Sequence, residues 1–408
     1  MHVVYLIPLG VVGFMRWFSW CCRRIPAMFY RPVAPGHTEA MTVVTPVYQE
    51  DPEIFRIAID SWLRNDVTEV TEVICVIDVT DRVCIEVAED YVGTGRLRVL
   101  QTDVPGKRDA LSKGYQAAGT PLVALVDSDT IWADDVSRWV TAPFEDASIG
   151  GVGTRQNVWQ PKGLWQNFAD MYLDYRYFDE IAAQSAVGQA VSCLSGRTAV
   201  YRRHLLMKYD EPFLRETFLG TQCMSGDDKR LTTLLLEGGH KTVLQREAQV
   251  WSTFPSDFPR FMKQRIRWAR NTWRSDLRAM KRGWIWGHKF LAFTTVDKAI
   301  SSFTLLLAPT FMSISLIREH WATASALAGW WLISRAAKLL PHLQRRPINI
   351  FRLPLFIGLS VLMACVKIFS LLTIRQHRWL TREVAVVDGE VVRTRAALPA
   401  AEALEISA

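Results

Sequence analysis

Residues 121–132 read PLVALVDSDTIW, an apolar run that ends in two aspartates on either side of a serine. The run from Leu122 to Val126 has the length and composition of a strand that is buried on both faces. Asp127 and Asp129 then lie at its carboxyl end, where a turn can direct both carboxylates toward one divalent cation. The same acids would also suit a solvated turn or the cap of a following helix. The surrounding segments decide between these interpretations.

Short β-branched runs alternate with helical stretches before this strand. The expected elements are strands at residues 42–47 and 73–79 and helices at residues 52–65 and 108–118. Such alternation favours a mostly parallel sheet of the nucleotide-binding kind, in which ligands bind at the carboxyl ends of strands. Tyr48 and Asp78 fall at such ends, as Asp127 does. We therefore expect three segments to converge on one crevice. There Tyr48 would stack on a nucleobase or simply cover the sheet edge, and Asp78 would accept hydrogen bonds from base or ribose groups or be an ordinary turn residue.

Two further motifs bring charge to this crevice. Lys107 and Arg108 can pair with phosphates, although each cation taken alone would also suit a solvated surface. Asp227 and Asp228 follow Gly226, just before a helix-like run. Paired carboxylates suit general-base catalysis, which contributes roughly 10²- to 10⁴-fold, but they equally suit a helix N-terminus. A metal-binding turn, a base and cations for a departing diphosphate are together what sugar transfer from a nucleotide donor requires.

Residues 258–281 predict a basic amphipathic helix, because apolar residues recur at steps of three or four with Lys and Arg between them. Such a helix suits the membrane interface, and the alternative is a core-facing helix of a soluble domain. Gln264, Arg267 and Trp268 share one face of it. Arg267 could pair with a leaving diphosphate and Trp268 could stack on an acceptor sugar, or both could merely anchor the helix to lipid headgroups.

The composition indicates a globular domain joined to membrane helices. The chain has 408 residues, a net charge of +7 and 49% hydrophobic residues. Its excess Lys and Arg precede three apolar segments, residues 290–317, 324–340 and 353–372, each near the roughly 20 residues that a spanning helix needs. Asp297 and Lys298 interrupt the first segment and are expected to face protein or a channel. The basic region therefore favours a membrane surface, and no recognised nucleic-acid module is present, so we expect no nucleic-acid partner.

The N-terminal segment, residues 3–22, is mostly apolar and is followed by Arg23 and Arg24 without a small-residue cleavage site. We expect an uncleaved anchor that leaves the following domain in the cytoplasm, although Arg16 interrupts it. The seven cysteines form no CxxC pair and no zinc-spaced set with histidine, which is typical of reduced thiols.

Together these motifs resemble one known group, the membrane-integrated family 2 glycosyltransferases with a GT-A fold, which include cellulose, chitin and hyaluronan synthases. The resemblance covers residues 41–382 and rests on residues 45–50, Asp78, 106–108, 127–129, 195–196, 226–228 and 264–268. Within this group, residues 226–232 and 379–382 are most similar to the processive hyaluronan synthases, type 3 capsular polysaccharide synthases and nodulation chitooligosaccharide synthases.

The resemblance implies a cytosolic GT-A α/β domain, with a Rossmann-like mixed sheet, joined to interfacial amphipathic helices and transmembrane helices. It implies UDP-sugar donors, Mg²⁺ or Mn²⁺, inversion at the anomeric carbon, and export of a growing polysaccharide through the protein's own channel. By position, Asp129 would hold the metal, and Asp228 would be the base beside Asp227. The donor would be bound by Tyr48, Glu50, Asp78, Lys107, Asp127, Arg267, Trp379, Thr381 and Arg382, the last three in a gating loop. The acceptor would be bound by Ser195, Gly196, Gln264 and Trp268.

Two residues depart from the group's pattern. Leu380 stands where glycine is common, and Arg197 stands where the hyaluronan synthases frequently have proline, which argues against hyaluronan itself as the product. In addition, three crossings after a cytoplasmic domain would place Trp379 outside the cell, where it could not gate a donor. We therefore expect one apolar segment, most plausibly part of residues 353–372, to be interfacial or re-entrant.

The expected organisation follows from these motifs. The predicted parts are an anchor at 1–24, a glycosyltransferase domain at 40–257, interface helices at 258–289, a channel region at 290–375, a gating loop at 376–386 and a polar tail at 387–408. The leading hypothesis is a plasma-membrane polysaccharide synthase, acting as a monomer or homodimer in the bilayer. Two alternatives stay open: a single-addition glycosyltransferase with a lipid acceptor, and a membrane scaffold with a decayed nucleotide-sugar fold.

Overall fold

The computed structural model describes residues 10–376, 384–387 and 390–393. The chain divides into two compact units. The α/β unit comprises Pro32–Gln160, Ala190–Pro255 and Ile374–Ala408, and the helical unit comprises Met1–Arg31, Pro161–Gln189 and Ser256–Thr373. Residues 161–189, which the sequence analysis placed inside one continuous domain, thus cluster with the C-terminal helices.

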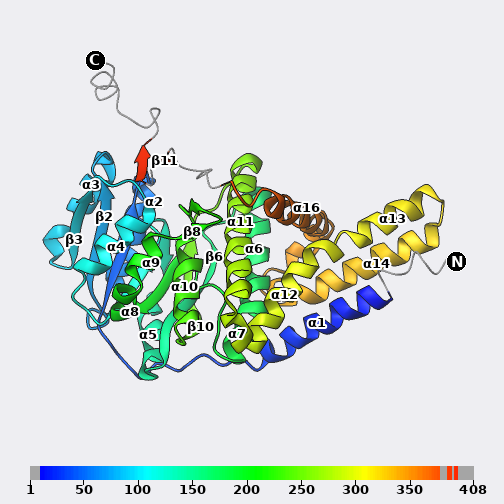
Figure 1. Ribbon diagram of the computed structural model, residues 1–408, viewed down its shortest axis with the longest axis horizontal. Helices are drawn as coiled ribbons and strands as arrows, with labels where there is room; N and C mark the ends of the chain where they lie inside the picture. Colours follow the sequence, from blue (N-terminus) through cyan, green and yellow to red (C-terminus); the bar gives the residue numbers. More distant parts are fainter. Residues whose placement is uncertain (1–9, 377–383, 388–389, 394–408) are drawn as a thin grey trace, which may run out of the picture. The chain divides into compact units, whose positions relative to one another are not determined.

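The α/β unit is built on an eight-stranded mixed sheet in the order β3-β2-β1-β4-β7-β6-β10-β5 (Figure 1). The strands are β1 (Met41–Val47), β2 (Val70–Asp78), β3 (Leu97–Thr102), β4 (Leu122–Val126), β5 (Thr130–Trp132), β6 (Ile149–Val158), β7 (Thr198–Arg202) and β10 (Lys241–Ser252). Strands β1, β2, β3 and β4 are parallel, as the sequence predicts, and β7 and β5 run antiparallel to their neighbours. The predicted α/β GT-A sheet is confirmed.

Helices pack on both faces of this sheet because its central strands are apolar on both faces. The helices are α2 (Pro52–Arg64), α3 (Arg82–Glu89), α4 (Lys107–Ala117), α5 (Val136–Thr141), α8 (Arg203–Lys208), α9 (Asp210–Leu214) and α10 (Asp227–Glu237). Phe55 and Trp62 of α2 join the core cluster that contains Val43, whereas a Cβ on Gly114 of α4 would meet the side chain of Val44 at 2.2 Å. Since Val43 and Val44 point to opposite faces, α2 and α4 cover opposite sides.

Two small hairpins complete the strands of this unit. Strands β8 (Thr217–Phe218) and β9 (Thr221–Gln222) form a hairpin just before α10. Strands β11 (Val384–Val387) and β12 (Glu390–Arg393) pair antiparallel in the region where the sequence predicts a loop and a polar tail. The predicted gating residues Trp379, Thr381 and Arg382 lie outside the described residues.

The helical unit gathers segments that are far apart in sequence (Figure 1). Its helices are α1 (Val11–Met28), α6 (Gly163–Tyr175), the π-helical turn η4 (Arg176–Glu180), α7 (Ile181–Ala186), α11 (Phe258–Arg282), α12 (Lys289–Thr304), α13 (Leu307–Ile317), α14 (Trp321–Lys338), α15 (Leu340–Arg345) and α16 (Leu353–Leu372). A core cluster joins Phe168 of α6, Phe261 of α11 and Phe356 of α16. The amphipathic helix predicted at residues 258–281 is thus confirmed as α11.

Two segments of the described chain are long and apolar enough to cross a membrane, Lys289–Ile317 and Pro347–Leu372. The segment expected between them forms α14, which is not one of the two and carries Arg335 and Lys338 in its last turn. Helix α16 packs along α11, where the indole Nε1 of Trp273 donates to the carbonyl of Lys367 at 2.9 Å.

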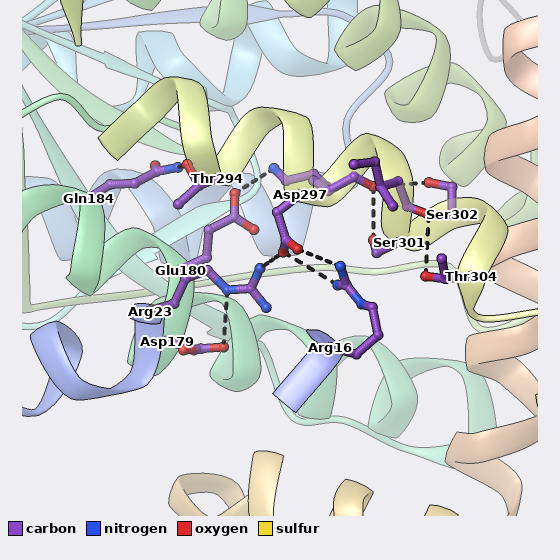
Figure 2. A network of polar contacts seen from close by, with 12 residues as sticks. Arg16, Arg23, Asp179, Glu180, Gln184, Thr294, Asp297, Ser301, Ser302 and Thr304 are labelled. Carbon is purple, nitrogen blue, oxygen red and sulfur yellow. Dashed lines mark hydrogen bonds and ion pairs between the residues drawn. The ribbon is translucent and has the colours of Figure 1, made fainter. Parts of the chain in front are cut away.

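Helix α1 buries one arginine and exposes several of its apolar side chains. Phe14, Phe18 and Ile25 are each more than half exposed, whereas Arg23 is 8% exposed. The guanidinium groups of Arg16 and Arg23 both pair with the carboxylate of Asp297 on α12 (Figure 2). Asp297 therefore faces protein, as predicted, and α1 is anchored to α12 by one acid between two arginines.

Candidate active site

The ammonium group of Lys107 joins the two acidic motifs of the α/β unit. Its Nζ atom lies 2.7 Å from Oδ1 of Asp127 and 2.7 Å from Oδ2 of Asp227. These carboxylate oxygens are thus at most twice that distance apart, although one hundred residues separate them in the chain. Burial lowers the pKa of Lys107, but the charges of Asp127 and Asp227 outweigh it and raise that pKa above its usual value. Lys107 therefore stays charged and holds the two motifs together.

The paired acids of α10 have different electrostatic environments. For Asp227, burial opposes ionisation, but the charge of Lys107 holds the pKa of its carboxyl below its usual value. For Asp228, burial and then the charge of Asp227 raise the pKa. Oδ1 of Asp228 accepts from the backbone N–H of Lys229 at 2.7 Å and Oδ2 from that of Gly196 at 3.3 Å, but burial and the charge of Asp227 outweigh these bonds. Asp228 is thus the stronger proton acceptor of the pair, as a general base should be.

Both acids also sit in the first turn of α10, so the helix-terminus interpretation is correct as well. Gly226 is the N-cap residue and has φ 85°, a left-handed conformation that favours glycine. The helix N-terminus stabilises the negative charge of both carboxylates. The same two acids therefore begin the helix and remain available as a catalytic pair, so the two interpretations do not compete.

The turn at Ser195 and Gly196 lies against these acids. A Cβ on Gly196 would stand 3.2 Å from Nζ of Lys107, 3.3 Å from Oδ2 of Asp227 and 3.5 Å from Cβ of Asp228. The first two distances are tight, so a side chain here would press on Lys107 and Asp227, whereas 3.5 Å from Cβ of Asp228 is ordinary contact. The structure thus brings the predicted acceptor-binding residue Gly196 next to the predicted base, and Ser195 beside it is buried.

Three carboxylates cluster at the carboxyl ends of β1 and β4. Glu50 accepts a hydrogen bond from Oγ of Ser128 at 2.8 Å, and Asp129 accepts from the backbone N–H of Thr253 at 3.1 Å. Burial, and then the charge of Asp129, raise the pKa of Glu50 to about 7, while burial raises that of Asp129. Asp127 adds to the repulsion at both.

Such crowding of oxygen ligands fits a hard divalent cation, which would relieve the repulsion among the three acids. The predicted metal ligand Asp129 and the predicted donor-binding residues Glu50 and Asp127 belong to this set. Asp129 does not cap the following helix, whose N-cap residue is Asp135. The fit of these residues therefore favours the cation-binding interpretation of Asp127 and Asp129.

Asp78 lies at the end of β2, and its Oδ1 accepts hydrogen bonds from the backbone N–H and the hydroxyl of Thr80, at 2.9 and 2.6 Å. Tyr48 follows β1 directly. Both residues thus stand at carboxyl ends of neighbouring parallel strands, as predicted, and their roles toward a nucleoside stay predictions.

Two buried arginines of this unit have contacts that the sequence did not indicate. Arg197, noted only as a departure from proline, packs its guanidinium 4.3 Å from the ring centroid of Phe254, and its charge acts on Asp129. Arg108, expected to bind phosphate, is 5% exposed and instead donates to the carbonyl of Phe213 and to Glu216. Its burial could not be read from the sequence, because the partner loop lies over one hundred residues away.

Gln264, Arg267 and Trp268 lie on α11 in the helical unit, all partly buried. Arg265, which was not singled out, is 6% exposed and packs its guanidinium against the rings of Trp268, Phe261 and Tyr172, with its centre 4.9, 4.7 and 5.4 Å from their centroids. Arg265 thus fixes the plane of Trp268 by cation–π contact. The roles of Gln264, Arg267 and Trp268 toward acceptor and diphosphate remain predictions.

Another group of metal-ligating residues lies in the helical unit. Asp170 and Asp174 of α6 and His342 of α15 have potential ligand atoms within 4.8 Å of one another. Arg345 pairs with Asp174, and Arg346 lies 3.6 Å from Asp170. Because these arginines already neutralise the acids, the group works as an ion-pair network that fastens α15 to α6.

Comparison with known proteins gives consistent results. Residues 37–271 match the family model described as "Glycosyltransferase like family 2". A type 2 glycosyltransferase of Zymoseptoria tritici is 26% identical over 90% of this chain and 80% of its own length. An N-acetylglucosaminyltransferase of Rhizobium meliloti is 28% identical over 90% of this chain and 87% of its own. Hyaluronan synthase 1 of Xenopus laevis is 27% identical over 61% of this chain and 42% of its own.

Among solved structures, a mannosyltransferase from Pyrobaculum calidifontis in complex with GDP-Man and Mn²⁺ matches with a TM-score of 0.62. The match covers 91% of this chain and 98% of that one at 16% identity. At this identity the similarity concerns the fold, and it extends over the sheet and the helical segments alike.

Proposed function

Since the chain belongs to glycosyltransferase family 2, we propose that it is a processive, inverting enzyme that joins UDP-sugars into a β-linked polysaccharide at a membrane. The observation that carries the proposal is the pair Asp227 and Asp228, in which Lys107 keeps one acid ionised while burial and the neighbouring charge raise the pKa of the other. Asp227 would then supply a fixed negative charge and Asp228 would accept a proton, and sugar transfer needs both roles.

In the proposed reaction, Asp228 accepts the proton of an acceptor hydroxyl as its oxygen attacks the anomeric carbon of the donor sugar. The bond from that carbon to the diphosphate oxygen breaks, and the nucleoside diphosphate leaves with the electron pair. Asp127 and Asp129, with Glu50, would hold a Mg²⁺ or Mn²⁺ ion, which would neutralise the diphosphate. Lys107 pairs with Asp127 and with Asp227, and so holds the metal-binding turn close to the acid pair that contains the base.

The helical unit supports a membrane location. Helix α1 presents apolar side chains outward and pairs its arginines inward with Asp297, an arrangement that suits lipid surroundings. The two apolar segments Lys289–Ile317 and Pro347–Leu372 support the same conclusion. We infer that the α/β unit works on the cytoplasmic side of the plasma membrane and that the helical unit exports the product.

The product is proposed to be hyaluronan-like or type 3 capsule-like, with N-acetylglucosamine as one donor sugar because of the rhizobial relative's name. The second candidate is single addition of a sugar to a lipid acceptor. It is favoured by the packing of α16 along α11, since the apolar helix α16 and the apolar face of α11 could receive a lipid chain.

The deciding experiment is a donor screen on the purified protein in lipid nanodiscs with Mn²⁺. UDP-glucose, UDP-N-acetylglucosamine and UDP-glucuronate are supplied singly and in pairs, UDP release is measured, and the radiolabelled product is sized. We expect UDP release and long water-soluble chains. Lipids carrying a single sugar would instead establish the second candidate, and absence of UDP release from folded protein with every donor would overturn both.

A further inference from the structure

The N-termini of α4 and α10 are joined by a second bridge next to that of Lys107. Lys107 pairs with Asp227, and its chain neighbour Arg108 pairs with Glu216 at 2.5 Å. Oε1 of Glu216 lies 3.9 Å from Nε of Arg230 on α10. Glu216 thus stands between an arginine of α4 and an arginine of α10.

This second bridge is buried. Arg108, Glu216 and Arg230 are 5%, 7% and 8% exposed. Buried ion pairs with additional hydrogen bonds hold one geometry, because leaving any member unpaired is costly. The guanidinium of Arg230 has such bonds, since its Nη2 atom donates to the carbonyl of Pro212 at 2.8 Å.

Arg108 also fixes the segment that leads into α10. Its Nη1 atom donates to the carbonyl of Phe213 at 2.7 Å, and its Nη2 atom donates to that of Ser225 at 3.2 Å. The backbone N–H of Cys223 donates to the carbonyl of Glu216 at 2.8 Å. One guanidinium therefore ties both ends of the β8–β9 hairpin segment and holds Ser225, three residues before Asp228.

We propose that Arg108 and Glu216 are positioning residues for the transfer step: they fix the first turn of α10 so that Asp228 meets the acceptor hydroxyl in reactive geometry. This proposal rests on the proposed function. Neither residue touches the reacting atoms, so both act through Asp228. Misplacing a reacting group by about 1 Å can cost roughly 10²-fold in rate.

The test uses Arg108→Met, Arg108→Lys and Glu216→Gln, with Arg203→Met as the matched control. Arg203 contacts the opposite end of α4, where it donates to the carbonyls of Tyr115 and Gln116 at 2.9 and 2.7 Å. We expect Arg108→Met to lower kcat about 100-fold with donor KM and UDP affinity within about twofold, and Arg108→Lys to recover part of the rate. Arg203→Met should lower stability comparably but leave kcat within about twofold.

A double-variant cycle shows whether the effect passes through the base. In an Asp228→Asn background, Arg108→Met should cause no further loss of rate, because the group that it positions is already absent. Three outcomes would each overturn the positioning role. They are full additivity of the two rate losses in the double variant, a fall in UDP affinity large enough to explain the loss in Arg108→Met, and an equal loss of kcat in Arg203→Met.

Hydrogen exchange separates this proposal from the proposed function. In Arg108→Met, amides of residues 213–228 should exchange faster, and in Arg203→Met they should not. If the wild-type protein transferred no sugar, the proposed function would fail while this exchange pattern would still report the bridge. Unchanged exchange over residues 213–228 in Arg108→Met would overturn the bridge itself.

Discussion

Each unit of this protein contains a triad of charged groups that is at least partly buried, and the two triads have opposite composition. In the α/β unit one cation, Lys107, lies between two acids, Asp127 and Asp227. In the helical unit one acid, Asp297, lies between two arginines, Arg16 and Arg23 (Figure 2). The first leaves surplus negative charge beside a crevice, which suits a cation and a proton acceptor. The second joins α1 to α12, and we assign it a structural role.

Asp228→Asn should give the largest effect on activity. The amide keeps the size of the carboxyl but cannot accept the proton, so we expect sugar transfer to fall roughly 10²- to 10⁴-fold. UDP affinity, measured by titration calorimetry with Mn²⁺, should stay within about threefold because Asp127 and Asp129 are intact. Retained polymer with lost UDP binding would show that Asp228 belongs to the donor site instead.

Asp297→Asn should have the largest effect on stability. It removes the acid from between Arg16 and Arg23 and leaves the buried cation of Arg23 and the partly buried cation of Arg16 unpaired, which we expect to lower the free energy of unfolding by about 3–5 kcal/mol. Denaturant titration in detergent micelles measures this, and Asp297→Glu, which keeps the charge, is the control. Unchanged stability in Asp297→Asn would remove the structural role that distinguishes the two triads.

Gly196→Ala should have an intermediate effect confined to activity. The added methyl group would lie 3.2 Å from Nζ of Lys107 and 3.3 Å from Oδ2 of Asp227, so these groups must shift by a few tenths of an ångström. We expect kcat to fall about tenfold with little change in the melting temperature. Gly119→Ala, where a Cβ meets no atom within 4 Å, is the matched control. Equal kcat in both variants would show that the acid pair tolerates movement.

The pH dependence should show the smallest effect. The pKa of Glu50 is raised from 4.5 to about 7, so between these values the folded protein binds more protons than the unfolded chain. Stability without metal should therefore fall as pH rises from about 5 to 7.5, and Glu50→Gln should flatten this slope. Mn²⁺ should stabilise the wild type more at pH 7.5 than at pH 5.5. If Glu50→Gln left the slope of stability against pH unchanged, a group other than Glu50 would cause the pH dependence.

Much of the α/β unit was predictable because its signals are local. The strand Leu122–Val126 appears at its predicted bounds, and α2 and α4 begin or end within one residue of theirs. Tyr48, Asp78 and Asp127 were expected in one crevice, because the carboxyl ends of neighbouring strands share an edge. The opposite pKa shifts of Asp227 and Asp228 were not predictable, since only the position of Lys107 distinguishes two adjacent identical residues.

The individual helices of the helical unit were predictable, but the contacts between them were not. Arg16 interrupts the apolar segment that was predicted to be an anchor, and its partner Asp297 lies 281 residues away. Arg108 was expected to bind phosphate, and its burial depends on a loop that begins 105 residues further along the chain. Charge pairs between remote segments leave no periodic pattern in the sequence, so the position of one partner does not predict that of the other.

The sequence by itself determined the family, the order of strands and helices, and the residue types available for sugar transfer, because these depend on hydrophobic periodicity and on motifs of a few residues. Only the tertiary structure decided which acid stays ionised, which arginine is structural and which charges neutralise one another. Those properties depend on burial and on distances of a few ångströms between remote segments, and the free energy of a charge changes steeply with both.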